Sequence, residues 1–212
     1  MIELFKHILH LDFEWLFQNF GTTVYLILFL VIFIETGLVI MPFLPGDSLL
    51  FTAGLFARLG YMDISMLVML LFAAAVLGDN TNYFIGKKIG LNVLKYKLSG
   101  KTLVKQEYLD KTHTFYEKYG AKTIIMARFV PIVRTFAPFV AGVAEMKYRT
   151  FLLFDLIGGA LWIGSMSFAG YFLGEIPWIR ANIEKVAIGI VLISVLPIII
   201  EIIKARKAKS QA

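Results

Sequence analysis

Long apolar runs are the feature that most restricts how this chain can fold. Four of them contain about twenty residues or more, the length that an α-helix needs to cross a hydrocarbon core of roughly 30 Å. These runs are Gly21–Met41, Tyr61–Gly86, Tyr148–Gly174 and Ile183–Ile203. With 58% hydrophobic and 17% charged residues, the chain is more apolar and less charged than a typical soluble domain. The sequence therefore predicts an all-α polytopic membrane protein with about four transmembrane helices.

Two further apolar segments, 42–60 and 121–146, are interrupted by helix breakers. A proline removes a backbone donor and clashes with the preceding turn, so the helical arms that remain are too short to cross the bilayer. The breakers are Pro42, Pro45 and Gly46 in the first segment and Pro131 and Pro138 in the second. Non-helical backbone at this depth must be buried in protein or line a wet cavity. We therefore expect two re-entrant hairpins that meet each other.

The basic residues indicate which ends of the spans face the cytoplasm. Lysines are concentrated in Lys87–Lys122 and in the tail after Ile203, and positively charged loops favour the cytoplasmic side. Four spans then place both termini inside, with the first hairpin entering from the outer face and the second from the cytoplasmic face. Such an inverted-repeat arrangement of broken segments is typical of a central transporter site. If Gly21–Gly60 instead forms one long hairpin, the N-terminus lies outside.

The remaining segments fit a single membrane domain. Met1–Phe20 has apolar residues at helical spacing among charges, which favours an amphipathic interfacial helix, although a short soluble helix that caps the bundle fits equally well. Lys101–Tyr119 also resembles an interfacial helix. The glycines within Tyr148–Gly174 predict close helix packing. The chain thus divides into the N-terminal helix (1–20), a first half (21–86), a lysine-rich cytoplasmic loop (87–120), a second half (121–203) and a basic cytoplasmic tail (204–212).

Four charged side chains interrupt otherwise apolar sequence. Glu35 and Asp47 lie in and after the first run, and Arg128 and Arg134 lie in the second broken segment. A charge at bilayer depth costs about 3 kcal/mol, so such residues mark candidate functional sites. An arginine stays charged when buried, and its planar fork matches two phosphate oxygens. We predict that Arg128 and Arg134 bind a phosphate head group and that Glu35 and Asp47 take up and release protons.

A structural alternative is that these charges form two ion pairs, Glu35 with Arg128 and Asp47 with Arg134, which only pin the hairpins together. Against it stands the cost of burying ionised pairs, which rarely improve on apolar packing. Three further residues are candidates for a supporting shell around the site. They are Asp79, Tyr83 and Asp155, and interfacial anchoring is the alternative role for the first two.

Several kinds of site find no support in the sequence. Cysteine is absent, so disulfides, thiolate nucleophiles and cysteine metal sites are excluded. His7, His10 and His113 lie outside the spans, so we expect no metal, no cofactor and no enzymatic activity. The net charge of +6 comes from loop lysines, which argues against nucleic-acid binding. A homo-oligomer is compatible with the sequence, which does not determine the oligomeric state.

The motifs FIETGLVIMPFLPGDSLLFTAG, GDNTNYFIG and ARFVPIVRTFAPFVAG resemble those of the DedA family, also described by its SNARE-associated or VTT domain, between Gly21 and Gly174. The resemblance implies a multi-pass protein of the bacterial cytoplasmic membrane with two opposed re-entrant hairpins. It also implies movement of undecaprenyl phosphate or phospholipids between leaflets, dependent on protons or membrane potential. The acid pair and the arginine pair of the family correspond here to Glu35, Asp47, Arg128 and Arg134.

The favoured function is a lipid carrier, in which the arginines replace water around a phosphate head group while the lipid tail stays in the bilayer. Undecaprenyl phosphate is the preferred cargo, because one small dianionic head group suits two arginines. The alternatives are a proton-coupled ion or drug antiporter, a non-transporting membrane scaffold, and a lipid phosphatase or transferase. No histidine or cysteine nucleophile for such an enzyme occurs in the spans.

Overall fold

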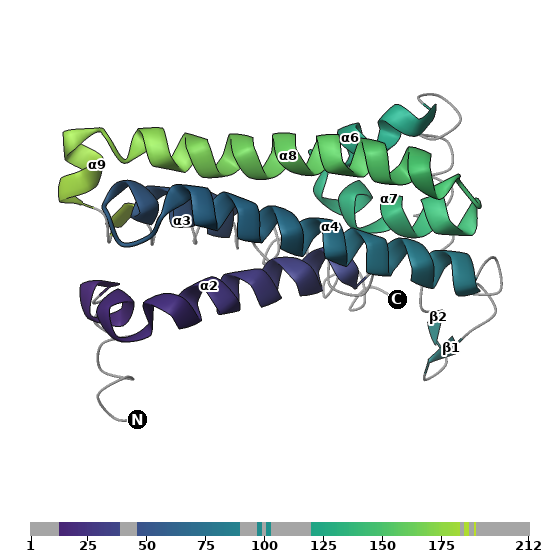
Figure 1. The fold of residues 1–212 in the computed structure, drawn as a ribbon, viewed down its shortest axis with the longest axis horizontal. Coiled ribbons are helices and arrows are strands. Elements are labelled where there is room, and N and C mark those ends of the chain that lie inside the picture. The colour runs from purple at the N-terminus through teal and green to yellow at the C-terminus, as the bar shows by residue number, and fades with distance from the viewer. Residues whose placement is uncertain are drawn as a thin grey trace, which may run out of the picture. The chain divides into compact units, whose positions relative to one another are not determined.

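The computed structural model describes residues 13–38, 46–89, 97–98, 101–102, 120–182, 185–186 and 189 (Figure 1). Three long helices carry most of them: α2 (Phe13–Gly37), α4 (Ile64–Ile89) and α8 (Tyr148–Leu173). The shorter helices are α3 (Gly46–Arg58), η2 (Gly120–Lys122), α6 (Thr123–Ala127), α7 (Pro131–Val143) and α9 (Pro177–Ala181). Strands β1 (Lys97–Leu98) and β2 (Lys101–Thr102) form a short antiparallel pair.

Three of the described helices are long and apolar enough to cross a membrane, which confirms the helical membrane class. They cover Asn19–Gly37, Ile64–Lys88 and Tyr148–Leu173. The helical part of the first ends at Gly37, before the predicted end at Met41, and residues 39–41 lie outside the described residues. The predicted fourth span, Ile183–Ile203, also lies outside them apart from residues 185, 186 and 189.

The first helix differs from the prediction at its start. Helix α2 begins at Phe13 and continues through Phe20, where non-helical torsion angles (φ −129°, ψ 16°) kink it. The predicted boundary between an interfacial helix and the first span therefore falls at a kink within one helix. The rest of the predicted N-terminal helix, residues 1–12, and residues 103–119 of the predicted interfacial helix lie outside the described residues.

The second broken segment consists of α6, a turn and α7. Val130 is extended (φ −119°, ψ 106°), as the residue before a proline prefers, and Pro131 begins α7, where a helix needs no backbone donor. Pro138 lies inside α7, so the prediction that it breaks the helix is wrong. Its ring removes only the hydrogen bond from residue 138 to the carbonyl of Arg134, and the other bonds of the helix hold α7 together.

Only the later part of the first broken segment is described. Gly46 is the first residue of α3, which continues without a break to Arg58, and Asp47 lies in its first turn. An acid is favoured there because the unpaired N–H groups of a helix start carry partial positive charge. Pro42 and Pro45 lie outside the described residues. Whether segment 42–60 forms a re-entrant hairpin therefore stays a prediction.

The chain divides into two compact units. The α3 unit contains residues 1–27, 45–67 and 166–212, and the α7 unit contains residues 28–44 and 68–165. In the α3 unit, α3 and α8 cross at two glycines. A Cβ atom on Gly54 would overlap the carbonyl oxygen of Ser167, and one on Gly170 would overlap that of Phe51. At the end of this crossing the exposed Arg58 donates to Glu175 (2.6 Å) and to the Tyr171 hydroxyl (3.2 Å).

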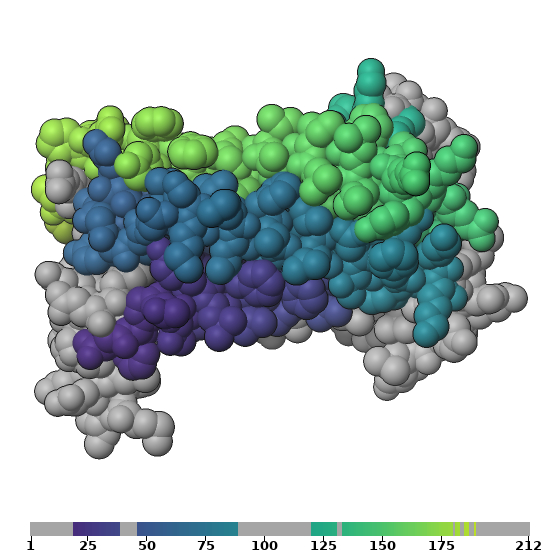
Figure 2. All heavy atoms as spheres, viewed as in Figure 1, coloured from purple at the N-terminus to yellow at the C-terminus, as the bar shows by residue number. Residues whose placement is uncertain are grey.

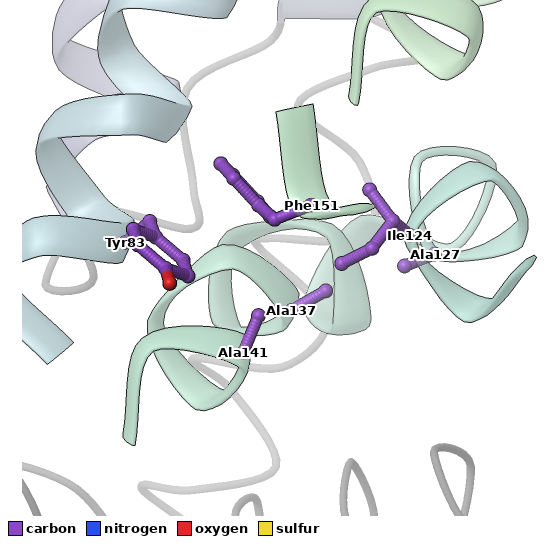
Figure 3. Packing of buried hydrophobic residues seen from close by; sticks show 6 residues of the cluster. All are labelled: Tyr83, Ile124, Ala127, Ala137, Ala141 and Phe151. Carbon is purple, nitrogen blue, oxygen red and sulfur yellow. The ribbon is translucent and has the colours of Figure 1, made fainter. Parts of the chain in front are cut away.

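In the α7 unit, α7 and α4 cross in the same way. A Cβ atom on Gly86 would overlap the carbonyl oxygen of Phe139, and one on Gly142 would overlap that of Tyr83. An apolar cluster around this crossing joins α4, α6, α7 and α8 (Figure 3). Its buried members are Tyr83, Ile124, Ala127, Ala137, Ala141 and Phe151. These contacts fix α7 and the end of α6 on the two long helices, and thereby position the residues between them.

The outer surfaces of the long helices are apolar. On α4 the exposed large side chains include Met66, Met69, Leu77 and Phe84, and on α8 they include Leu153, Leu161 and Phe172. Figure 2 shows side chains of α4 uncovered along much of its length. Apolar side chains in this number on a helix surface suit contact with lipid rather than with water.

Candidate functional site

The α7 unit buries five charged side chains. They are Glu35, Asp79, Arg128, Arg134 and Asp155, of which the most accessible is 5% exposed. A buried charge must be paired or hydrogen-bonded, because transfer out of water otherwise costs many kcal/mol. The partners of each of these side chains therefore define the site. Both guanidinium groups are enclosed by protein in this conformation.

Arg134, in the first turns of α7, pairs with Glu35 near the end of α2. Its Nη2 atom lies 2.6 Å from Oε1 of Glu35. Helix α2 reaches this place because two glycines meet: a Cβ atom on Gly37 would lie 3.3 Å from Cα of Gly78 on α4. The pair differs from the structural alternative considered from the sequence, which joined Glu35 with Arg128.

Arg128, at the end of α6, is shared by two acids. Its Nη2 atom donates to Oδ1 of Asp155 on α8 (2.5 Å) and to Oδ2 of Asp79 on α4. Glycines on α8 make room for the side chain, since a Cβ atom on Gly158 would lie 3.1 Å from Cδ of Arg128. Asp79 and Asp155 were predicted to form a supporting shell, and they are instead direct partners of an arginine.

Trp162 connects the two ion-pair groups. Its buried ring lies 4.6 Å from the Cζ atom of Arg134 and 5.9 Å from that of Arg128, measured to the ring centroid. A guanidinium within about 6 Å of an indole is attracted to the ring face. The sequence analysis did not single out Trp162. Its spacing of two helical turns from Asp155 places both on one face of α8 and was the available signal.

Asn82 holds the backbone around the site. Its amide nitrogen donates to the carbonyl oxygens of Thr36 (3.2 Å) and Thr135 (2.8 Å). Thr36 lies in the last turn of α2, where helical carbonyls have no partner within the helix. Asn82 therefore joins the end of α2 and the start of α7 to α4, next to Glu35 and Arg134. This role was also missed from the sequence, which showed only that polar residues gather in GDNTNYFIG.

Two other predicted residues lie elsewhere. Tyr83 belongs to the apolar cluster, where its ring stacks on Phe151 at 4.5 Å and its hydroxyl donates to the carbonyl oxygen of Met146. The predicted support of the charged site by Tyr83 is therefore replaced by a packing role. Asp47 belongs to the α3 unit and is partly buried in the first turn of α3.

The composition of the site limits its chemistry. Three carboxyl groups accompany two guanidinium groups, and within the described residues Nε and Nη1 of Arg128 have no hydrogen-bond partner. Planar donors of this kind bind oxyanions. Among the same residues, no group of three or more histidine or acidic side chains is arranged to hold a metal ion. The geometry favours binding of an anion over metal or nucleophilic chemistry.

Comparisons with known proteins relate the chain to membrane proteins. Residues 44–172 match the model of the VTT domain. The chain is 49% identical to protein DedA of Escherichia coli strain K12 over 213 residues, which covers 99% of this chain and 96% of that protein. It is 48% identical to an uncharacterized membrane protein of Mycobacterium leprae over 170 residues, covering 80% of this chain and 75% of the relative.

A more distant relative is the inner membrane protein YghB of E. coli strain K12. It is 32% identical over 165 residues, which cover 78% of this chain and 74% of YghB. No solved structure matches the chain. Because residues 44–172 match the VTT domain and the similarity to DedA covers nearly the full length, this chain belongs to the DedA family of VTT-domain membrane proteins.

Proposed function

We propose that this protein moves a lipid with a phosphate head group between the leaflets of the bacterial inner membrane, and that undecaprenyl phosphate is its cargo. The observation that carries the proposal is the burial of Arg128 and Arg134, held by carboxylates, in the α7 unit. Burying such charges for packing alone brings little stability. The buried arginines have a functional explanation if the carboxylates, in the lipid-free protein, occupy the positions that phosphate oxygens take when a lipid is bound.

The transport step is an exchange of partners at the guanidinium groups. The phosphate of the lipid displaces Glu35 from Arg134 and the two aspartates from Arg128. Arginine binds phosphate through paired, charge-assisted hydrogen bonds that are roughly twice as strong as neutral ones. The exchange requires an opened conformation, because both arginines are enclosed in the described one. Glu35, and Asp47 in the α3 unit, then take up protons as the head group arrives, without catalysis of any bond change.

In a lipid carrier, the apolar helix surfaces, the spans and the hairpins each have a role in moving the lipid. The tail stays against the apolar surfaces of the long helices while the head group crosses through protein. Four spans, two opposed re-entrant hairpins in an inverted repeat, and both termini in the cytoplasm make such a crossing possible, since broken segments supply the polar backbone at membrane depth. The partners are membrane lipids and protons, and no cofactor takes part.

Reconstitution in lipid vesicles tests the proposal. Labelled undecaprenyl phosphate is expected to move between leaflets with the wild-type protein and to stop in Arg128→Ala and Arg134→Ala. Arg58→Ala is the matched control, because it removes an exposed ion-paired arginine from the α3 unit. Phosphatidylglycerol and phosphatidylethanolamine, tested in parallel, identify the preferred head group. Movement that continues unchanged in both site variants would rule out the arginine-based carrier, and release of inorganic phosphate would instead indicate an enzyme.

A proton-coupled cation antiporter is the second candidate function. It is favoured by the excess of buried carboxyl groups over guanidinium groups in the α7 unit, since an acidic site suits a cation. The same vesicles distinguish the two functions. An antiporter changes the internal pH when sodium or potassium is added outside and moves no lipid.

A further inference from the structure

The charges of the α7 unit do not balance when every group is ionised. Glu35 and Arg134 pair with each other. Arg128 faces two carboxyl groups, Asp79 and Asp155, and is the only cation among the described residues that donates to them. The fully ionised site thus carries one surplus negative charge in a place closed to water. An uncompensated buried carboxylate is disfavoured strongly enough that it takes up a proton instead.

The geometry places the two aspartates close together. Both accept from the same nitrogen, Nη2 of Arg128, which brings their carboxyl groups next to each other. The opposite oxygens, Oδ1 of Asp79 and Oδ2 of Asp155, are buried and have no hydrogen-bond partner among the described residues. Two adjacent carboxyl groups in such surroundings hold one proton between them, because both cannot stay ionised.

Among the described residues, no other cation donates a hydrogen bond to the pair. The elements packed around it contribute three charged groups: Arg128 from the end of α6, Arg134 from α7, whose charge acts on Asp79, and Glu35 from α2. Arg134 is engaged by Glu35. On α8, Trp162 faces the guanidinium groups and is neutral. One proton on the aspartate pair makes the whole site electrically neutral.

We infer that Asp79 and Asp155 form a proton-binding site that couples head-group binding to proton uptake. When a phosphate dianion draws Arg128 away, the pair loses its cation, and the remaining ionised carboxylate takes a second proton from a hydronium ion of the solvent, which becomes water. One O–H bond of the hydronium ion breaks, one O–H bond forms on the carboxyl group, and no other bond changes. This coupling rests on the proposed function, whereas the shared proton in the empty protein does not. The Asp79–Asp155 pair then carries most of the proton exchange, and Glu35 and Asp47 carry the rest.

The coupling is measured on the full-length protein in detergent with farnesyl phosphate as the soluble probe. Calorimetric titration in buffers of different ionisation enthalpy gives the number of protons taken up per bound phosphate. The wild type is expected to take up about one, and its affinity to fall by up to about tenfold per unit rise in pH over the linked range. The double variant Asp79→Asn with Asp155→Asn is expected to bind the probe with little proton uptake and a flat pH profile, whereas Asp155→Asn alone keeps one ionised carboxylate beside Arg128 and should still take up about one proton. Glu175→Gln, which alters an exposed ion pair of the α3 unit, should behave as the wild type.

The outcomes separate this inference from the proposed function. If the wild type does not bind farnesyl phosphate, the proposed carrier fails. If the wild type binds it without proton uptake, or if the double variant takes up as many protons as the wild type, the aspartate pair is not the coupling site. Should the double variant fail to fold, infrared spectroscopy of the empty wild type decides. The carbonyl band of a buried, protonated carboxylic acid is expected at neutral pH, and its absence would overturn the shared proton.

Discussion

The α3 unit and the α7 unit use one packing device in different surroundings. In each, a helix of 13 residues crosses a helix of 26 residues. At each crossing, both helices have one glycine that packs against a backbone carbonyl group of the other helix. On each helix, this glycine lies one turn after the residue whose carbonyl group contacts the other helix's glycine. The pairs are Phe51 and Gly54 on α3 with Ser167 and Gly170 on α8, and Phe139 and Gly142 on α7 with Tyr83 and Gly86 on α4.

What differs is the burial of charge. All described charged side chains that are fully buried belong to the α7 unit, whereas the ion pair of the α3 unit, Arg58 with Glu175, lies at its exposed end. The glycine crossing is therefore scaffold, since it occurs with and without a charged site. The site arises from what surrounds the crossing in the α7 unit: the end of α2, the turn after α6 and the acidic face of α8. The following predictions test this division between scaffold and site.

The largest difference is expected between two arginines. Arg128→Ala leaves Asp79 and Asp155 buried beside each other without their cation, and removing one partner of a buried ion pair typically costs about 3–5 kcal/mol. Arg58→Ala removes a surface pair and should cost less than about 1 kcal/mol. Thermal unfolding of the two variants in detergent measures the contrast. Adding Asp79→Asn and Asp155→Asn together to Arg128→Ala should restore part of the loss, because no ionisable carboxyl group is then left buried without a cation.

If Arg128→Ala unfolds no earlier than Arg58→Ala, the buried pair does not stabilise the α7 unit. The charges would then be held in place by the glycine crossing alone.

The glycine crossings come next in expected size. Gly54→Ala in the α3 unit and Gly142→Ala in the α7 unit each place a methyl group against a backbone carbonyl, and since backbone cannot move aside as a side chain can, each should cost about 1–3 kcal/mol or more. Gly164→Ala is the control, because no atom of the described part of the chain lies within 4 Å of the added methyl group. Similar melting temperatures for all three variants would show that the crossings are not close packed in the membrane protein.

How much of this was predictable differs between scaffold and site. Tyr148–Gly174 was predicted as a span and α8 runs from Tyr148 to Leu173, because a run of apolar residues is a local property of the sequence. Of the glycines predicted to allow close packing there, Gly158, Gly159 and Gly170 do so, but no atom of the described residues lies within 4 Å of a Cβ atom built on Gly164. Which glycine meets another helix depends on how the helices cross, and sequence periodicity does not contain that information.

The site residues show the same limit. Asp79, Asn82 and Tyr83 follow one another at helical spacing, so the sequence indicated that they gather at one end of a span. It could not show that Asp79 turns to Arg128 and Tyr83 to the apolar cluster. The residue types of Glu35, Arg128 and Arg134 were sufficient to mark them as buried charges of interest. Their partners, from α2, α4 and α8, are tertiary contacts and had to come from the structure.

A smaller effect is expected from Asn82. Asn82→Ala removes two hydrogen bonds between α4 and the backbones of Thr36 and Thr135, and two buried carbonyl groups then lose a donor, at a cost of about 1–3 kcal/mol. Thr81→Ala should cost less, because the exposed Thr81 hydroxyl donates within its own helix, to the carbonyl oxygen of Leu77. Chemical unfolding of both variants provides the comparison. Equal losses would mean that Asn82 does not join the elements of the α7 unit.

The smallest effect is expected from Trp162, and it tests whether the site is a single unit. Trp162→Phe keeps an aromatic ring beside Arg134 and Arg128 but weakens its attraction for cations, so the loss should be about 0.5–1 kcal/mol, plus the cost of a smaller buried ring. Trp178→Phe, at a side chain that is 66% exposed, should leave unfolding unchanged. Because Trp162 contacts both guanidinium groups, its effect should shrink when Arg134→Ala and Arg128→Ala are already present. A double-mutant cycle with no coupling energy between Trp162 and either arginine would mean that the ring only fills space, and that the Glu35–Arg134 and Asp79–Arg128–Asp155 groups act independently.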